Sequence, residues 1–223
     1  MTLKFFCSAL LKFALGVLLV GALIFLPAGT LSYPAGWLLM AILFIPMFGA
    51  GFVMMVKNPA LLSRRLEGKE KQREQDTVVK LSGLMFIAGF VLAGLDFRFS
   101  WLPLPRAVSL VAAAAFLLAY LLYAEVLREN TYLSRTIKVE AGQKVVDTGL
   151  YGIVRHPMYS ATLLLFLSMP LVLGSVIALI PFLAYPFIIA ARLRGEEKLL
   201  EAELDGYTAY KQKVRWRLIP FIY

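Results

Sequence analysis

The side chains best suited to chemistry gather in the second half of this chain, in three short segments rich in polar and aromatic residues. The first segment, residues 148–159, has the sequence Thr-Gly-Leu-Tyr-Gly-Ile-Val-Arg-His-Pro-Met-Tyr. Proline suits the first position of a helix, because the N–H that it lacks would have no partner there. We therefore expect a helix to begin at Pro157, with His156 at its mouth. The free N–H groups of Met158 and Tyr159 would then point at an anion such as a carboxylate.

The second segment, residues 192–200, directly follows the longest apolar run and has the sequence Arg-Leu-Arg-Gly-Glu-Glu-Lys-Leu-Leu. Arg192 and Glu196 are four residues apart, so they share one face of a helix. An isolated pair of this kind is ordinarily solvated and contributes on the order of a few tenths of a kcal/mol. Here, a hairpin in the apolar run would bring the pair to the membrane side on which His156 lies. A ligand that carries both an ammonium, for Glu196, and a carboxylate, for the helix start, would suit the two clusters.

The third segment, residues 204–220, places Tyr207, Tyr210 and Val214 at positions i, i+3 and i+7 of one helix face. The simpler interpretation is a packing stripe on an amphipathic helix at the membrane interface. A comparable alternative stays open for the Arg-His-Pro triplet of the first segment, since Arg and Tyr side chains also anchor proteins by binding lipid headgroups.

The elements that position these segments are predicted by the apolar runs. Of the 223 residues, 60% are hydrophobic and 17% are charged, whereas soluble domains have about 45–50% apolar and about 25% charged residues. About 20 apolar residues cross the hydrocarbon core of a bilayer. Four runs have roughly that length and a fifth is longer; they are residues 13–26 (extended back to residue 5), 37–56, 81–97, 107–127 and 158–191.

The last run is too long for one span and contains four helix-breaking residues, Pro170, Gly174, Pro181 and Pro186. We interpret it as a helical hairpin. The predicted fold is therefore all-α: a polytopic integral membrane protein with four transmembrane helices in residues 1–127, and a region 128–223 that holds the Pro-broken hairpin 158–191 and a cytoplasmic amphipathic helix. Residues 57–80, rich in both charges, are expected to form a solvated loop, with a short surface helix as the alternative.

The positive charge predicts the orientation in the membrane. The chain has 23 Lys and Arg residues against 14 Asp and Glu, a net charge of +9. With the amino terminus in the cytoplasm, only Arg98 and Arg106 fall outside, which leaves 21 of the 23 basic residues inside. The positive-inside rule therefore predicts that both termini are cytoplasmic, in the inner membrane if the cell is bacterial. The charge faces anionic lipid headgroups, so nucleic acid is not needed to explain it.

Few other groups are candidates for chemistry. The single histidine and the single cysteine, Cys7, exclude a His-rich metal site, a thiolate cluster and an internal disulfide, so we expect no metal. Asp96 lies near the outer boundary of the third run and Glu125 near the inner end of the fourth. An acid within a membrane is a functional candidate, although a charged side chain at the membrane boundary costs little free energy. The roles of both acids stay open.

Taken together and in order, the three segments resemble the isoprenylcysteine carboxyl methyltransferase family and, more loosely, the related membrane phospholipid N-methyltransferases. The resemblance covers about residues 128–220. It depends on three matches: residues 148–159, then Arg192-x-x-x-Glu196-Glu197-x-x-Leu200, then Tyr207-x-x-Tyr210 with Val214 and Pro220.

The resemblance implies an S-adenosyl-L-methionine site built from the carboxyl-terminal half, without a Rossmann domain. In agreement, no Gly-x-Gly-x-x-Gly follows a strand pattern in this sequence. It also implies that Arg192 faces the methyl-accepting carboxylate. The residues that it assigns to the cofactor are Gln143, Lys144, Val145, Val146, Tyr151, His156, Pro157, Met158, Tyr159 and Glu196.

The predicted function is therefore methyl transfer to the carboxylate of a lipophilic, isoprenylcysteine-like acceptor that enters from the bilayer. A carboxylate is already ionised and needs no general base, and the planar guanidinium of Arg192 can hold it bidentately. N- or S-methylation of a phospholipid or another lipophile is an alternative, for which a base would be wanted. A sterol-type membrane reductase that uses NADPH, and a non-enzymatic lipid-binding protein, are the other classes left open.

Overall fold

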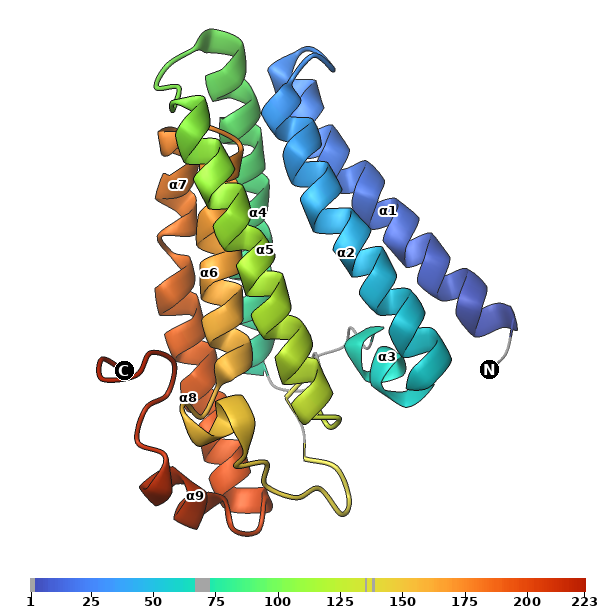
Figure 1. Ribbon diagram of the computed structural model, residues 1–223, viewed down its shortest axis with the longest axis vertical. Coiled ribbons are helices and arrows are strands. Elements are labelled where there is room, and N and C mark those ends of the chain that lie inside the picture. Colours follow the sequence, from blue (N-terminus) through green and yellow to red (C-terminus); the bar gives the residue numbers. More distant parts are fainter. Residues whose placement is uncertain (1–2, 67–72, 135, 138) are drawn as a thin grey trace.

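The computed structural model describes residues 3–66, 73–134, 136–137 and 139–223, and in these residues the protein consists of helices and connecting loops. Figure 1 shows the longer helices side by side along the long axis of the molecule. The helices are α1 Leu3–Ala28, α2 Pro34–Lys57, α3 Pro59–Leu66, α4 Arg73–Phe99, α5 Arg106–Glu129, the 3-10 turn η1 Gly149–Gly152, α6 Pro157–Val172, α7 Val176–Phe182, α8 Tyr185–Glu203 and α9 Tyr207–Lys213.

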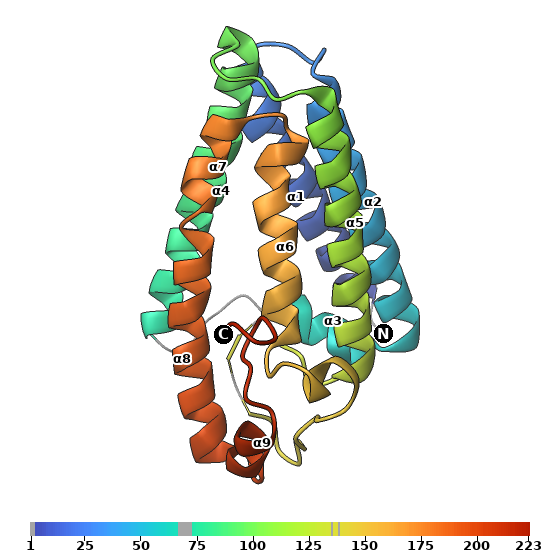
Figure 2. The same cartoon turned by 60° about the vertical axis from the view of Figure 1, so that its left-hand side comes forward.

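Five segments in the described chain are long and apolar enough to cross a membrane, which confirms the predicted polytopic, all-α fold. Four of them are the predicted amino-terminal spans, and the fifth combines α7 with α8. The shorter apolar α6 lies between α5 on one side and α7 and α8 on the other, as Figure 2 shows. The five segments are Phe6–Ala28, Pro34–Lys57, Asp76–Phe99, Arg106–Glu129 and Val176–Glu203.

The predicted hairpin is present, but its second arm is longer than expected. Gly174 turns the chain between α6 and α7 with a φ of 76°, a left-handed conformation that favours glycine. The second arm does not end near residue 191, because α8 continues without a break to Glu203. Arg192 and Glu196 therefore lie on the same helix that forms part of the fifth span, and not on a separate amphipathic helix.

The hairpin turn is tied to the opposite loop by Asp96, whose side chain is buried. Its carboxylate accepts hydrogen bonds from the Ser175 hydroxyl and, at 2.9 Å, from the backbone N–H of Leu102. The Ser175 hydroxyl in turn accepts from the N–H of Ala178 at 3.1 Å and so caps α7. Asp96 thus has a structural explanation: it joins the loop after α4 to the start of α7.

The prediction of a loop for residues 57–80 is wrong for much of this segment. Residues 59–66 form α3 and α4 begins at Arg73, while residues 67–72 lie outside the described chain. The Asn58 side chain accepts a hydrogen bond from the N–H of Leu61 at 3.1 Å, and Pro59 follows at the first helical position. An Asn-Pro pair is a known signal for a helix start, so the sequence did contain the information.

Two arginines of α3 hold the loop that follows α5. Arg64 pairs with Glu140, at 2.6 Å between Nη2 and Oε2, and donates to the carbonyl of Thr131 at 2.9 Å. Arg65 donates to the carbonyl of Ser134 at 3.2 Å. The amino-terminal half of the chain therefore contributes to positioning residues 131–134 and Glu140 of the loop that borders the candidate site.

Candidate functional site

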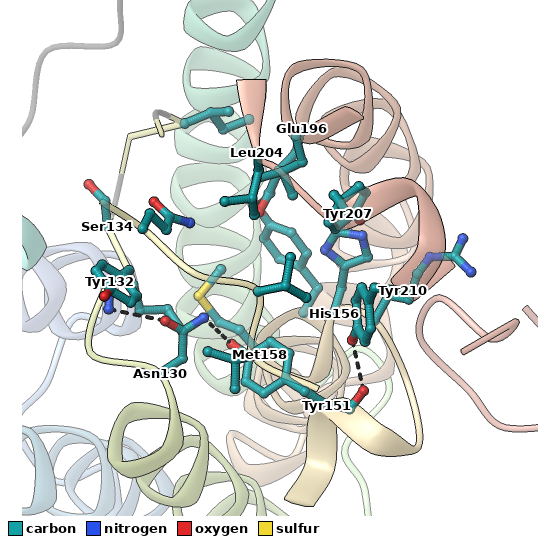
Figure 3. A pocket seen from close by; sticks show the side chains of 18 of the residues that line it. Asn130, Tyr132, Ser134, Tyr151, His156, Met158, Glu196, Leu204, Tyr207 and Tyr210 are labelled. Carbon is teal, nitrogen blue, oxygen red and sulfur yellow. Dashed lines mark hydrogen bonds between the residues drawn. The ribbon is translucent and has the colours of Figure 1, made fainter. Parts of the chain in front are cut away.

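A pocket opens at the end of the bundle that carries α9, between the loops of residues 130–156, the start of α6, the end of α8 and α9 (Figure 3). Ten of the eleven residues singled out from the sequence line it; Pro157 is buried at the start of α6. The structure thus brings the three chemically interesting segments together, although their contacts with a cofactor stay a prediction. The ten are Gln143, Lys144, Val145, Val146, Tyr151, His156, Met158, Tyr159, Arg192 and Glu196.

The hydroxyl group of Tyr159 connects the two charged residues of α8. It donates to Oε2 of Glu196 at 2.5 Å and accepts from Nε of Arg192 at 3.0 Å. Tyr159 is buried, whereas Arg192 and Glu196 are half-buried at the pocket wall. Their predicted spacing on one helix face is thus confirmed, and the first turn of α6 provides the group that links them.

The first turn of α6 corrects one detail of the sequence analysis. The helix begins at Pro157 with His156 in the N-cap position, as predicted. However, the backbone N–H of Tyr159 already donates to the carbonyl of His156 at 3.0 Å. This N–H group is therefore not free to receive an anion, and polar recognition at this place depends more on side chains.

A buried ion cluster behind the pocket was missed by the sequence analysis. Glu197 is only 3% exposed, and its Oε1 lies 2.8 Å from Nε of Arg155 and 3.2 Å from Nε2 of His156. Its Oε2 accepts from Nε of Arg217 at 3.0 Å. Glu197 follows Glu196 in the sequence but points about 100° further round the helix. One glutamate thus faces the pocket, while the next fixes the histidine ring.

The glycine-containing turn before α6 positions Tyr151. Gly149 has a φ of 52°, and a Cβ there would lie 1.3 Å from Oε1 of Glu129. The Glu129 carboxylate accepts from the N–H of Leu150 at 3.0 Å and so holds the start of η1. The Tyr151 hydroxyl accepts from the side-chain amide of Asn130 at 3.0 Å, a contact drawn in Figure 3. Glycine is favoured at position 149, because the left-handed backbone angle favours it and a Cβ would displace the Glu129 carboxylate that holds the turn.

The tyrosines of α9 have two roles. As predicted, Tyr207, Tyr210 and Val214 form a packing stripe, together with Leu204. Tyr207 and Tyr210 also line the pocket, and burial raises the pKa of both hydroxyl groups, so they stay protonated at neutral pH. The Tyr207 hydroxyl is buried, and it has no hydrogen-bond partner within the described residues. A polar group of a bound ligand would satisfy it.

Glu125 lies outside this arrangement. Its carboxylate pairs with Arg128, 2.5 Å away on the same helix, and its side chain is 39% exposed. It is not among the residues that line the pocket. We therefore assign Glu125 to the helix surface.

The comparison with protein families reaches this same part of the chain. Residues 106–204 match the phospholipid methyltransferase family. The match extends from the start of α5 to the residue after α8, so it includes the Tyr159, Arg192 and Glu196 triad. It supports the coarser prediction of a membrane methyltransferase, whereas the isoprenylcysteine-specific activity and the acceptor are not resolved by it.

Curated relatives with detectable similarity include three Delta(14)-sterol reductases. Identity is 28% over 93 residues with that of Methylotuvimicrobium alcaliphilum (40% of this chain, 22% of the relative) and 29% over 91 residues with that of Mus musculus (40% and 22%). The Arabidopsis thaliana protein is 26% identical over 170 residues (66% and 45%). The chain therefore spans less than half the length of each of these relatives.

Proposed function

We propose that this chain is an integral-membrane methyltransferase that transfers the methyl group of S-adenosyl-L-methionine to the carboxylate of a lipophilic acceptor. The observation that carries the proposal is the Arg192–Tyr159–Glu196 triad in the wall of the pocket. The triad presents an acid and a guanidinium on adjacent turns of one helix, and the phospholipid methyltransferase match includes it.

The residues of the pocket fit the methionine part of this cofactor. The Glu196 carboxylate suits the ammonium group, and the unsatisfied Tyr207 hydroxyl suits a further polar atom. Aromatic faces attract a sulfonium cation, and five tyrosines line the pocket: Tyr132, Tyr151, Tyr159, Tyr207 and Tyr210. Arg155 does not add free positive charge here, because Glu197 neutralises it.

Arg192 is the residue that we assign to the acceptor. It lies in α8, the helix that continues the fifth span, so an acceptor could keep its apolar chain in the bilayer and its anionic group at Arg192. The guanidinium would orient a carboxylate bidentately. When bound, S-adenosyl-L-methionine would supply an electrophilic methyl group: the bond from an acceptor carboxylate oxygen to the methyl carbon would form in line as the carbon–sulfur bond breaks, and S-adenosylhomocysteine would leave. The protein then contributes positioning and exclusion of water, and no general base is required.

The acceptor can be tested by methyl transfer from labelled cofactor to thioether acids with prenyl or acyl chains, compared with matched amines. We expect the acids to be methylated, and the apparent KM to rise as the chain is shortened, by about 0.8 kcal/mol of binding per buried CH₂. Arg192→Lys should bind the cofactor but lose most turnover, because lysine lacks the planar fork. Methylation of the amines alone, with Arg192→Lys equal to wild type, would replace this proposal with a phospholipid-type N-methyltransferase.

A reductase is the second candidate function, favoured by the three sterol reductase relatives. NADPH carries several negatively charged phosphate groups. The carboxylate of Glu196 at the pocket wall would repel these groups, whereas it would attract a cationic ligand. The test is NADPH oxidation by the reconstituted protein in the presence of a sterol diene. We expect none above the rate without protein, and sterol-dependent oxidation would establish the reductase instead.

A further inference from the structure

We propose that residues 216–223, the carboxyl-terminal hook, form an interfacial anchor that inserts its apolar tip into the bilayer surface beside anionic lipid headgroups. Figures 1 and 2 place the end of the chain level with α3 and with the start of α1, and not as far out as α9. Near this level the membrane-crossing helices α1 and α4 begin and α2 ends, whereas α8 continues beyond it toward α9. The hook therefore lies at the height of the membrane surface.

The tip of the hook is apolar and exposed. The exposed fractions are 86% for Phe221, 74% for Ile222 and 44% for Ile219. The hook is nevertheless folded back on itself. The main-chain oxygen of Tyr223 accepts hydrogen bonds from the N–H groups of Arg217, Leu218 and Ile219, at 2.9, 2.8 and 3.0 Å. The ring of Trp216 lies 5.7 Å from that of Phe221. A folded loop that presents three large apolar side chains suits the boundary between headgroups and acyl chains.

Positive charge accompanies this tip. Arg215 is exposed, and its guanidinium has no hydrogen-bond or ion-pair partner in the part of the chain that the structure describes. Lys211 and Lys213 precede it, paired with Glu201 and Asp147. An apolar tip next to a cation is the combination that binds an anionic lipid surface. The apolar side chains insert among the upper acyl chains, and the cation attracts the anionic headgroups.

The hook is also part of the wall behind the pocket. Its Trp216 carbonyl accepts from the N–H of Arg155, and its Arg217 carbonyl from the N–H of His156, both at 2.9 Å. The Arg217 side chain contacts Glu197. A hook that is held in the membrane surface therefore sets the height of His156 relative to the bilayer. This inference is independent of which reaction the pocket performs.

The first test uses Trp216 as a native probe. The full chain with Trp37→Phe and Trp101→Phe would be reconstituted in nanodiscs that contain brominated phosphatidylglycerol or, at equal content, brominated phosphatidylcholine. We expect both lipids to quench the remaining fluorescence, the anionic one more strongly. Arg215→Gln should reduce that preference by up to about fivefold, the effect of one cation near an anionic surface. Absence of quenching, or equal quenching by both lipids, would overturn the proposal.

A second measurement gives the depth of the tip without removing any apolar group from the core. In a Cys7→Ser background, a spin label is attached through Ile222→Cys or, as a matched control, through Gln212→Cys, an exposed position of α9. We expect the label at position 222 to be more accessible to oxygen than to a water-soluble nickel chelate, and the label at position 212 to show the reverse. If both labels face water equally, the hook is not an anchor.

Discussion

At the scale of single residues, the neighbours Glu196 and Glu197 have opposite tasks. Glu196 is half-buried at the pocket and interacts with a hydroxyl, whereas Glu197 is buried between the guanidinium groups of Arg155 and Arg217 and the imidazole ring of His156. A buried carboxylate is tolerated only when it is paired and hydrogen-bonded. We therefore infer that Glu197 stabilises the fold and orients the His156 ring, while Glu196 is available to a ligand.

This division predicts different effects on stability. Glu197→Ala leaves the buried Arg155 without its carboxylate, and removal of one partner of a buried pair costs about 3–5 kcal/mol. We expect the unfolding temperature in detergent to fall by several degrees. The control, Glu125→Ala, removes an exposed partner of Arg128 and should leave that temperature unchanged. Equal effects of the two changes would contradict the structural role of Glu197.

The sequence showed one of these two glutamates and not the other for a physical reason. The relation of Arg192 to Glu196 follows from the helical period alone, so spacing predicts it. The partners of Glu197 are distant in the sequence: Arg155 is 42 residues away and Arg217 is 20 residues away. Tertiary packing decides which face of α8 is covered by the segment that carries Arg217. No local pattern in a single sequence contains that information.

At the scale of elements, the missed helical segments did have local signals. The sequence after Arg192 is rich in Leu, Glu, Ala and Lys, which are strong helix formers, so the continuation of α8 to Glu203 agrees with propensity. The charged residues of this segment favoured the interpretation that a separate amphipathic helix starts there. Charged side chains, however, determine whether a helix lies in lipid or in water, and they do not interrupt it. The apolar runs and the proline breaks, in contrast, predicted the spans and the hairpin well, because lipid forces such segments to be helical.

The packing of α4 against α7 gives a matched pair of predictions. A Cβ at Gly89 would lie 2.2 Å from the Phe182 ring, while one at Gly83 would meet nothing within 4 Å. Gly89→Ala should therefore force the two helices apart, at a cost typical of overpacking, about 1–3 kcal/mol. Gly83→Ala should be neutral or stabilising by about 0.5–1 kcal/mol. Thermal unfolding in detergent distinguishes them, and a Gly89→Ala protein as stable as Gly83→Ala would contradict this packing.

At the scale of the whole molecule, the start of α1 and the carboxyl-terminal end of the chain lie toward the same end of the bundle (Figure 1). That arrangement agrees with the proposed orientation, in which 21 of the 23 basic residues and both ends are cytoplasmic. We expect a reporter that is active only in the cytoplasm to work when fused after Tyr223. A reporter joined at residue 102, in the loop between α4 and α5, is the control and should be inactive. The opposite pattern would invert the proposed topology.

The central claim is that the pocket binds S-adenosyl-L-methionine, and calorimetric titration of the purified protein tests it most directly. We predict binding of this cofactor and of S-adenosylhomocysteine, and none of NADPH. Glu196→Gln should weaken the affinity by roughly tenfold to 150-fold, as expected for loss of a charged hydrogen bond worth about 1.5–3 kcal/mol. Arg128→Gln, at an exposed position away from the pocket, should bind as wild type does. Binding of NADPH alone, or an affinity for S-adenosyl-L-methionine that Glu196→Gln leaves unchanged, would contradict the account.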